Sequence, residues 1–282
     1  MIVKKNNLLL SEAKKPIIYD VYFEPSSGPK PVVIFAHGYK GFKDWGAWEL
    51  VAETFAKARF FFIKFNFSHN GGTIEQPIDF PDLEAFATNN YSIELDDLNR
   101  IVDFITSNNS FFKEINSEKI NLIGHSRGGG IVLIHAEEDH RVGSVTTWAG
   151  VSDFKARFNK GTRVFDNWLK SGVTYIENSR TKQQLPHYLQ FYKDFEKNEE
   201  RLTIKRAVSH LSKPQLIIHG SDDTTVPIDE AIAVSTWNSE SNLEIINGAD
   251  HVFGSIHPWK EKNIPPNLQQ AASYTITFLN NL

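Results

Sequence analysis

One serine in this sequence lies in a setting where its hydroxyl could act as a nucleophile. Residues 124–128 read G-H-S-R-G, a G-x-S-x-G pattern with Ser126 at its centre. An apolar run over 120–123 precedes the pattern, and a helix-like stretch over 130–138 follows it. In this strand-turn-helix context the pattern indicates a nucleophile elbow, a sharp turn that exposes the serine. The sequence therefore predicts acyl transfer, with Ser126 as the attacking group.

A serine hydroxyl needs a base within hydrogen-bond reach, and the base needs a carboxylate to orient it. In a sheet that carries such an elbow, the acid follows the serine along the chain and the histidine follows the acid. Asp222 and Asp223 lie in the turn after an apolar run at 216–219, and His251 follows a last apolar run at 243–246. His251 is thus the predicted base, and one of the two neighbouring aspartates is the predicted acid.

The other histidines are poorer candidates for the base. His125 lies inside the elbow, where its ring cannot approach the serine from the correct side. His187 and His210 precede the acid, and His257 lacks the Gly-Ala-Asp stretch found before His251. There is no H-E-x-x-H pattern, no cluster of histidines and carboxylates, and no glycine-rich phosphate loop. We therefore expect neither a metal site nor a cofactor.

The elements that must position these residues alternate along the chain. Short apolar runs alternate with helical periods, which predicts a mainly parallel sheet with helices on both faces. Strands are expected at residues 17–23 (antiparallel), 32–35, 60–65, 120–123, 143–148, 216–219 and 243–246, and helices near 48–55, 91–105, 130–138 and 268–279. The 282 residues are expected to form a single α/β domain over 1–282.

Two segments break this alternation. Residues 68–90 are long, rich in glycine and proline, and without a sustained period, so we expect either a loop over a sheet edge or a functional loop. Residues 154–211 lie between two predicted strands and are a candidate cap, or lid, over the substrate. Tyr188, Phe191, Tyr192 and Phe195 form an aromatic stripe there at helical spacing. We expect most of this stripe to pack the insertion onto the core.

The composition narrows the class of protein further. The chain is 40% hydrophobic and 23% charged with a net charge of -4, values typical of a globular protein that does not bind nucleic acid. Its lack of cysteine excludes disulfides and a thiol nucleophile. The apolar run near the amino terminus, residues 8–10, is too short for a signal peptide, and no stretch reaches membrane-spanning length. We expect a cytoplasmic protein that acts on a small molecule without a membrane or nucleic-acid partner. The sequence does not determine an oligomeric state.

Four short motifs, taken together, resemble the α/β-hydrolase superfamily. They are an H-G turn at 37–38, the G-H-S-x-G elbow, an H-G-x-x-D-x-x-V-P turn at 219–227 and a G-A-D-H loop at 248–251. Their order is similar to that of bacterial dienelactone hydrolases and cinnamoyl (feruloyl) esterases, and the resemblance covers nearly the whole chain. It implies an α/β-hydrolase fold, with a mostly parallel central sheet flanked by helices and a cap insertion between late strands.

The resemblance also assigns roles. It implies that Asp223, not Asp222, is the acid. The oxyanion of the tetrahedral intermediate needs two backbone N–H donors. One is expected at Arg127, directly after the nucleophile, and the resemblance places the second at Tyr39. The implied activity is that of a carboxylesterase-type serine hydrolase that forms an acyl-enzyme from a small-molecule ester or thioester.

Two other functions stay open at this level. The first is an aminopeptidase or other amidase, because the triad and elbow do not distinguish esters from amides. Its peptide amino terminus would need an anchoring carboxylate, for which Glu177, Asp194 and Glu196 in the insertion are available. The second is a binding module that keeps the fold without the chemistry. Such a module would be expected to lack a member of the triad, whereas every expected position is filled here.

Overall fold

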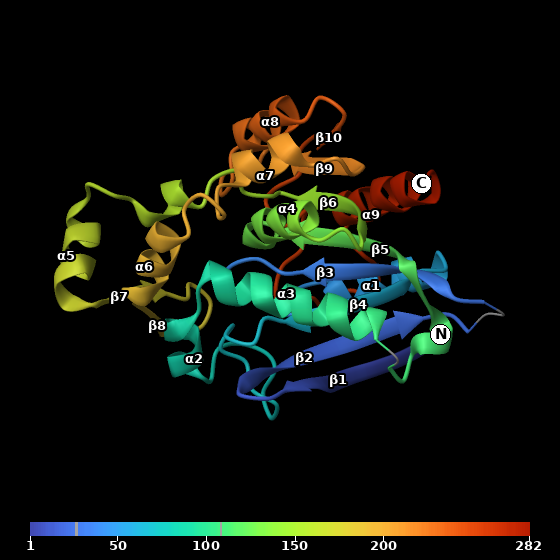
Figure 1. The fold of residues 1–282 in the computed structure, drawn as a ribbon, viewed down its shortest axis with the longest axis horizontal. Helices are drawn as coiled ribbons and strands as arrows, with labels where there is room; N and C mark the ends of the chain where they lie inside the picture. The colour runs from blue at the N-terminus through green and yellow to red at the C-terminus, as the bar shows by residue number, and fades with distance from the viewer. Residues whose placement is uncertain (26–27, 108) are drawn as a thin grey trace.

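The computed structural model describes residues 1–25, 28–107 and 109–282, and in these residues an eight-stranded sheet runs through the molecule (Figure 1). The strand order is β1-β2-β4-β3-β5-β6-β9-β10. The pairs β1–β2 and β2–β4 are antiparallel, and all later neighbours are parallel. The strands span Ile2–Ser11 (β1), Lys14–Phe23 (β2), Lys30–Ala36 (β3), Phe61–Asn66 (β4), Ile115–His125 (β5), Val142–Trp148 (β6), Gln215–Gly220 (β9) and Asn242–Ile246 (β10).

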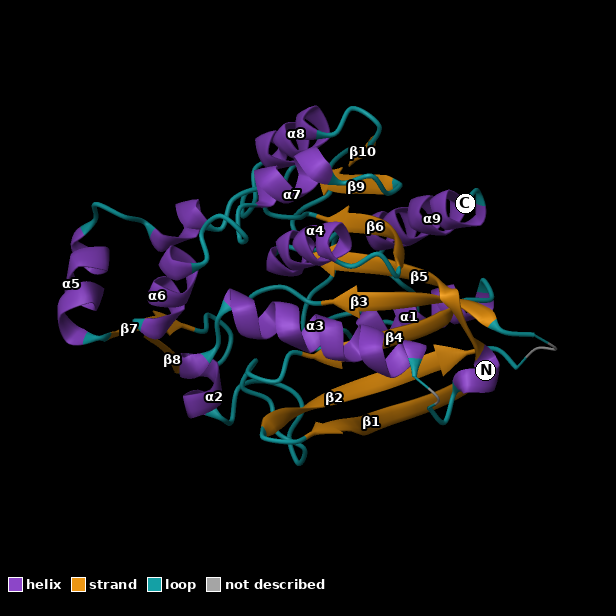
Figure 2. Cartoon of the chain, in the orientation of Figure 1, coloured by secondary structure: helices purple, strands orange, loops and turns teal. Residues whose placement is uncertain are grey.

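Helices cover both faces of this sheet because the central strands are apolar on both sides (Figure 2). In β3, for example, Val32 and Ile34 face one helical layer, and Val33 and Phe35 face the other. The first layer contains Tyr91–Thr106 (α3), Arg127–Glu138 (α4), Ile204–His210 (α7) and Ile228–Trp237 (α8), and the second contains Trp48–Lys57 (α1) and Pro266–Asn280 (α9). The predicted mainly parallel sheet between helical layers is confirmed.

The segment between β6 and β9 leaves the sheet and returns to it. It projects to one side of the molecule in Figure 1 as Arg163–Ser171 (α5), the hairpin of Val173–Glu177 (β7) and Gln184–Tyr188 (β8), and Gln190–Lys197 (α6). Helix α7 then packs back onto α4 and α8. Tyr192 and Phe195 of the aromatic stripe are buried, as expected for residues that pack this segment onto the core, whereas Tyr188 is only partly buried.

Some elements were not predicted from the sequence. Strand β1 is mostly exposed, and the lysines and asparagines at 4–7 interrupt its apolar residues, so its pattern does not indicate a strand. It is held by its pairing with β2 and by Ile2 and Leu9, which pack against the core. The long segment 68–90 contains a short helix, Leu83–Thr88 (α2), whose first turn is capped by the side chain of Asp82. Helix α2 packs under β8, so this segment supports the projecting hairpin. Helix α8 was also not predicted from the sequence.

Every helix within the described residues is too short or too polar to span a lipid bilayer.

Candidate active site

The turn at the end of β5 places Ser126 in a backbone conformation that residues other than glycine rarely adopt. Its φ is 55° and its ψ is -119°, between the strand and the first residue of α4. The turn is held because Ser126 N–H donates to the Trp148 carbonyl at 3.0 Å, and its own carbonyl accepts from Gly129 N–H at 2.9 Å. A Cβ at Gly128 would collide with the carbonyl oxygen of Ala36. Gly128, two positions after the serine, is therefore needed for α4 to lie against the end of β3.

Two other segments bring their side chains to Ser126. Nε2 of His251 lies 3.0 Å from Oγ of Ser126, and Nδ1 of His251 lies 2.7 Å from Oδ2 of Asp223. The carboxylate can only accept from Nδ1–H, which leaves Nε2 free to accept the serine proton. The three residues that the sequence nominated from three distant stretches thus form one continuous hydrogen-bonded chain.

The carboxylate in this chain is that of Asp223, and its environment stabilises its charged form. Oδ1 accepts the backbone N–H groups of Thr225 and Val226, both at 2.8 Å, and Nε2 of His219 lies 3.3 Å from Oδ2. Burial opposes ionisation, but the hydrogen bonds from His219, His251 and the backbone outweigh it and hold the pKa of Asp223 below its usual range. Asp222 is exposed and accepts from the hydroxyl of Ser221 instead.

The loop after β3 packs directly against the serine. A Cβ at Gly38 would lie 2.8 Å from Cβ of Ser126, closer than a real Cβ approaches its neighbours, and 3.3 Å from Oγ of Ser126. The backbone that follows Gly38 is that of Tyr39, and the backbone that follows Ser126 is that of Arg127, the first residue of α4. First-turn N–H groups have no partner within their helix. This arrangement can place two amide donors beside the carbonyl that the serine attacks.

A buried cluster of charges holds this loop in place. Lys43, on the loop, and Lys64, on β4, both pair with Asp20 of β2, at 2.9 and 3.0 Å, and both pair with Asp44. The ammonium of Lys64 also donates to the Lys43 carbonyl at 3.0 Å. Both lysine side chains and that of Asp20 are fully buried, so their charges depend on one another for solvation. The cluster therefore ties the loop that carries Tyr39 to two strands of the sheet.

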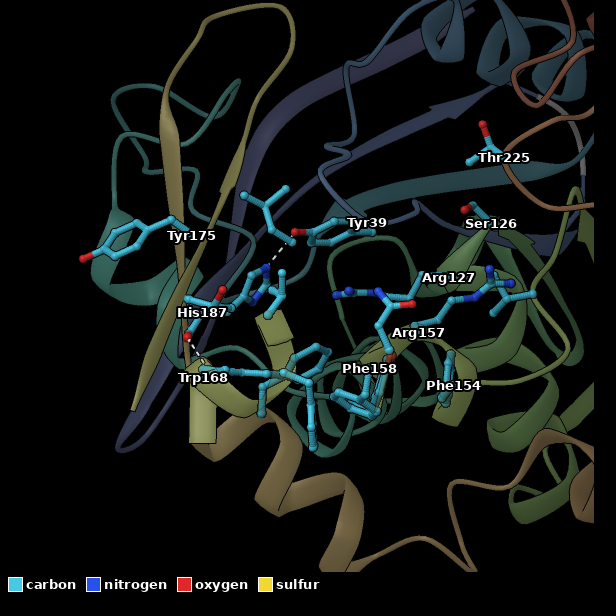
Figure 3. Close-up of a pocket in the computed structure, with 18 of the residues that line it drawn as sticks. Tyr39, Ser126, Arg127, Phe154, Arg157, Phe158, Trp168, Tyr175, His187 and Thr225 are labelled. Atoms are coloured by element: carbon cyan, nitrogen blue, oxygen red, sulfur yellow. Dashed lines mark hydrogen bonds between the residues drawn. The ribbon is translucent and has the colours of Figure 1, made fainter. Parts of the chain in front are cut away.

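Ser126 opens onto two cavities. The first, which we call the aromatic cavity, has a volume of about 340 Å³. Most of its lining comes from the segment 154–211, with Ser126 at one end (Figure 3). Its aromatic walls include Tyr91, Phe154, Phe158, Phe165, Trp168 and Phe191. It can therefore hold an apolar group joined to a carbonyl at the serine.

Polar groups of Tyr39, Arg127 and His187 also line the aromatic cavity. The guanidinium of Arg127 lies 4.2 Å from the centre of the Tyr39 ring and pairs with buried Glu94 at 3.4 Å. The hydroxyl of Tyr39 lies 2.6 Å from Nε2 of His187 on β8, and the His187 carbonyl accepts from Nε1 of Trp168 at 2.9 Å (Figure 3). The projecting hairpin is thus hydrogen-bonded to the loop that contacts the serine.

The second cavity, which we call the polar cavity, adjoins the first, shares Tyr39, Ser126 and Thr225 with it, and has a volume of about 670 Å³. Its walls are the loop over residues 37–42, the histidine loop over 251–257 and the turn of the β7–β8 hairpin at 178–180. Its lining includes His251 and the side chains of Lys40 and Arg180. The second cavity thus exposes more polar groups than the aromatic cavity does, although Phe42, Trp45 and Phe80 also line it.

The remaining histidines near the serine are structural. Nε2 of His125 contacts the carbonyl oxygen of His251 at 2.9 Å, and burial lowers its pKa to about 3. Nδ1 of His37 contacts the Gly38 carbonyl at 2.9 Å, and burial lowers its pKa to about 4. Both rings are neutral near pH 7, so each can donate one N–H to a loop carbonyl. His187 contacts the hydroxyl of Tyr39, and His210 contacts the carbonyl oxygen of Arg206.

Sequence reasoning missed two residues of this site. His187 was considered only as a base and set aside, although it contacts Tyr39 across 148 positions of sequence. No local pattern signals a contact of that range. Lys40 carried no motif of its own, although it follows the predicted oxyanion donor directly.

The comparisons with known proteins agree with this architecture. A sequence model of the α/β-hydrolase fold matches residues 31–158. Est1E from Butyrivibrio proteoclasticus, in a structure with ferulic acid bound, is similar with a TM-score of 0.73 and 18% identity, over 94% of this chain and 95% of that one. A dienelactone hydrolase from Anabaena variabilis is similar with a TM-score of 0.64 and 17% identity, over 99% and 98%.

A third similar structure is mouse alpha/beta hydrolase domain-containing protein 10, with a TM-score of 0.70 and 16% identity over 98% of each chain. No curated protein matches the sequence significantly. The chain has the α/β-hydrolase fold, and the resemblance that the four motifs indicated is confirmed.

Proposed function

We propose that this protein is a serine hydrolase that cleaves carboxylic esters, and by the same route thioesters, through an acyl-enzyme on Ser126. The observation that carries the proposal is the position of His251, whose two ring nitrogens lie within hydrogen-bond distance of Ser126 and Asp223. A histidine bonded in this way accepts the serine proton at one nitrogen while the carboxylate orients it at the other.

The reaction then runs in two halves. In the first, Oγ of Ser126 attacks the ester carbonyl, His251 takes the proton, and the amides of Tyr39 and Arg127 stabilise the oxyanion. The intermediate collapses, and the imidazolium gives its proton to the departing alcohol or thiol. In the second half, water attacks the acyl-enzyme by the same proton route and releases the acid. Loss of one oxyanion donor in such enzymes costs roughly 3–4 kcal/mol of transition-state stabilisation.

The aromatic cavity is proposed to hold the acyl group, and the segment 154–211 is proposed to act as the cap over it. Twelve residues of this segment line the cavity, which also contains Ser126. An apolar acyl chain or an aromatic ring attached to the carbonyl would gain contact with these walls. The similarity to Est1E, whose structure holds ferulic acid, supports an aromatic acyl group without defining it.

An amidase acting on peptide amino termini is less well supported. Such an enzyme needs a carboxylate near the reacting bond, but the described residues that line the two cavities include neither aspartate nor glutamate. The three carboxylates nominated from the sequence bind elsewhere. Glu177 pairs with Lys182, Asp194 accepts from Ser92, and Glu196 accepts from Tyr192. We therefore favour ester substrates over peptides bound by their amino termini.

The direct test is the variant Ser126→Ala. It should lose measurable turnover of aryl esters while keeping the melting temperature of the native protein, and a fluorophosphonate should label the native protein at Ser126 only. A panel of esters that differ in acyl length and aromaticity, with one thioester and one arylamide, would define the substrate. Undiminished hydrolysis by Ser126→Ala would refute the proposal. Binding of esters without turnover by the native protein would indicate a binding module.

A further inference from the structure

The two cavities differ in their relation to the proposed base. His251 lines the polar cavity, and it does not occur among the described residues that line the aromatic cavity. The departing oxygen or sulfur must receive its proton from His251, so the leaving group must lie on the His251 side of the serine. If the protein works as proposed above, the polar cavity is therefore the site of the alcohol or thiol portion of the substrate.

The charged side chains that line the polar cavity are both cationic. Its lining includes Lys40 and Arg180, and the described part of the lining contains no carboxylate, although the whole chain has a net charge of -4. Arg180 forms an ion pair with Asp79, which compensates its charge. His125 is held neutral by burial, with a pKa of about 3. His257 accepts the N–H of Gly46 at Nδ1, at 3.0 Å, as a neutral ring does.

Lys40 is the cation in this lining that lacks a counter-charge. Among the residues that the structure describes, no carboxylate lies within ion-pair distance of its ammonium, which sits 5.6 Å from the centre of the Tyr39 ring. The side chain is partly buried, and this burial lowers its pKa from the usual value of 10.5. A partly desolvated, unpaired ammonium attracts an anion more strongly than a solvated one does.

From this geometry we propose that the polar cavity selects leaving groups that carry an anionic group, a carboxylate or a phosphate, and that Lys40 is the residue that recognises it. In the first half-reaction, the bond between the carbonyl carbon and Ser126 Oγ forms and the bond to the leaving oxygen or sulfur breaks. The proton of the serine passes through His251 to that atom. The negative charge of the leaving group takes no part in these bonds and serves only for binding beside Lys40.

The test uses three esters of one aromatic acid, 3-phenylpropanoic acid, on the intact protein. The leaving groups are methyl 4-hydroxybenzoate (neutral), 4-hydroxybenzoate (a carboxylate) and 4-hydroxyphenyl phosphate. For each protein, kcat/KM of an anionic ester divided by kcat/KM of the neutral ester gives an anionic-to-neutral ratio. The proteins compared are the native protein, Lys40→Met and Lys40→Arg. Lys40→Met removes the charge and keeps nearly the length of the side chain, and Lys40→Arg keeps the charge. Comparing each ratio with that of the native protein cancels differences in the intrinsic reactivity of the esters.

In Lys40→Met the ratio should fall by about tenfold for at least one anionic ester, which corresponds to roughly 1.4 kcal/mol. Lys40→Arg should keep most of the ratio, and 0.5 M salt should lower it in the native protein because ions screen the attraction. A larger fall of the ratio for the carboxylate ester would indicate a carboxylate site, and a larger fall for the phosphate ester would indicate a phosphate site. Lys170→Met, an exposed lysine of α5 that lines neither cavity, should leave both ratios unchanged.

Equal losses for all three esters in Lys40→Met would overturn this inference, because they would indicate disturbance of the neighbouring Tyr39 amide. An unchanged ratio would overturn it as well. Neither result affects the proposed function, which depends on whether Ser126→Ala abolishes hydrolysis of the neutral ester. If Ser126→Ala retains that hydrolysis, the proposed function fails first, and the inference about Lys40 fails with it.

Discussion

The hydroxyl of Tyr39 lies 2.6 Å from Nε2 of His187, and this contact joins the loop beside the serine to the hairpin over the aromatic cavity. The ring of His187 is buried and stacks on Phe191, so the hairpin end of the contact is held firmly. The loop end is held by the buried charges of Lys43 and Lys64. The position of the Tyr39 backbone therefore depends on both the sheet and the projecting segment.

Removing this contact should reduce catalysis without unfolding the protein. A single hydrogen bond contributes about 0.5–1.5 kcal/mol net, so Tyr39→Phe and His187→Gln should each lower kcat/KM for an aromatic ester about fivefold. The double variant should lose little more than either single variant, because both remove the same contact. Tyr188→Phe is the control, since its hydroxyl bonds Glu84 at the exposed surface. Fully additive losses would show that the contact does not couple the two segments.

The two neighbouring aspartates should differ sharply in their importance. Asp223→Asn removes the acceptor that orients His251, and kcat for an aryl ester should fall by about 10³- to 10⁴-fold. Asp222→Asn should stay within about twofold of the native value, because Asp222 is exposed and its side chain accepts only from the hydroxyl of Ser221. Steady-state rates of the two variants show which aspartate orients His251. A larger loss of kcat in Asp222→Asn than in Asp223→Asn would identify Asp222 as the acid instead.

A methyl group at Gly38 should damage activity more than stability. A Cβ there would lie 2.8 Å from Cβ of Ser126, so either the serine or the loop of Tyr39 must shift. Displacing an oxyanion donor should lower kcat by tenfold or more. Gly143→Ala is the matched control, because its Cβ would meet only the Ile120 carbonyl, at 3.4 Å. Native kcat in Gly38→Ala would show that the loop does not contribute to the chemistry.

Buried histidines should make the protein less stable in mild acid. Burial lowers the folded-state pKa of His37 to about 4, and that of His125 and His187 to about 3. Between these values and the unfolded value of 6.5, the unfolded chain binds more protons, so stability is present above pH 6.5 and falls as the pH decreases. Each additional proton bound by the unfolded chain lowers the free energy of unfolding by about 1.4 kcal/mol for each unit that the pH falls. Two buried carboxyl groups oppose this trend: burial raises the pKa of Asp97 to about 6 and also raises the pKa of Glu94.

Urea unfolding at pH 6.5, 5.5 and 4.5 measures this dependence. The free energy of unfolding should fall over the series, and the fall should be shallower in His187→Gln, which removes one of the three groups. The same slope in both proteins would mean that His187 is not held neutral in the folded state.

The sequence predicted the parts of this fold that depend on local pattern. The apolar runs of β3, β5 and β9 are buried on both faces, so their strands follow from composition alone. The elbow also follows from sequence, because the turn requires small residues where Gly124 and Gly128 lie. These features need no knowledge of distant residues.

Other features could not be predicted because they depend on contacts made far along the chain. Strand β1 depends on its pairing with β2, and its polar residues 4–7 break the alternation that would mark a strand. The β7–β8 hairpin contains Pro186 and lies on α2, so neither strand stands out by composition. The sequence motifs left Asp222 and Asp223 as neighbours, and only the resemblance to a family chose between them. Their opposite exposure is visible only in the folded protein.

The projecting segment supplies most of the walls of the aromatic cavity but none of the three residues in the hydrogen-bonded chain at the serine. Selectivity and reactivity are consequently encoded by separable stretches of polypeptide. A hairpin grafted from a protein of similar architecture could retune which acids are released while the bond-breaking apparatus stays intact, provided that a partner for the Tyr39 hydroxyl is carried along with it.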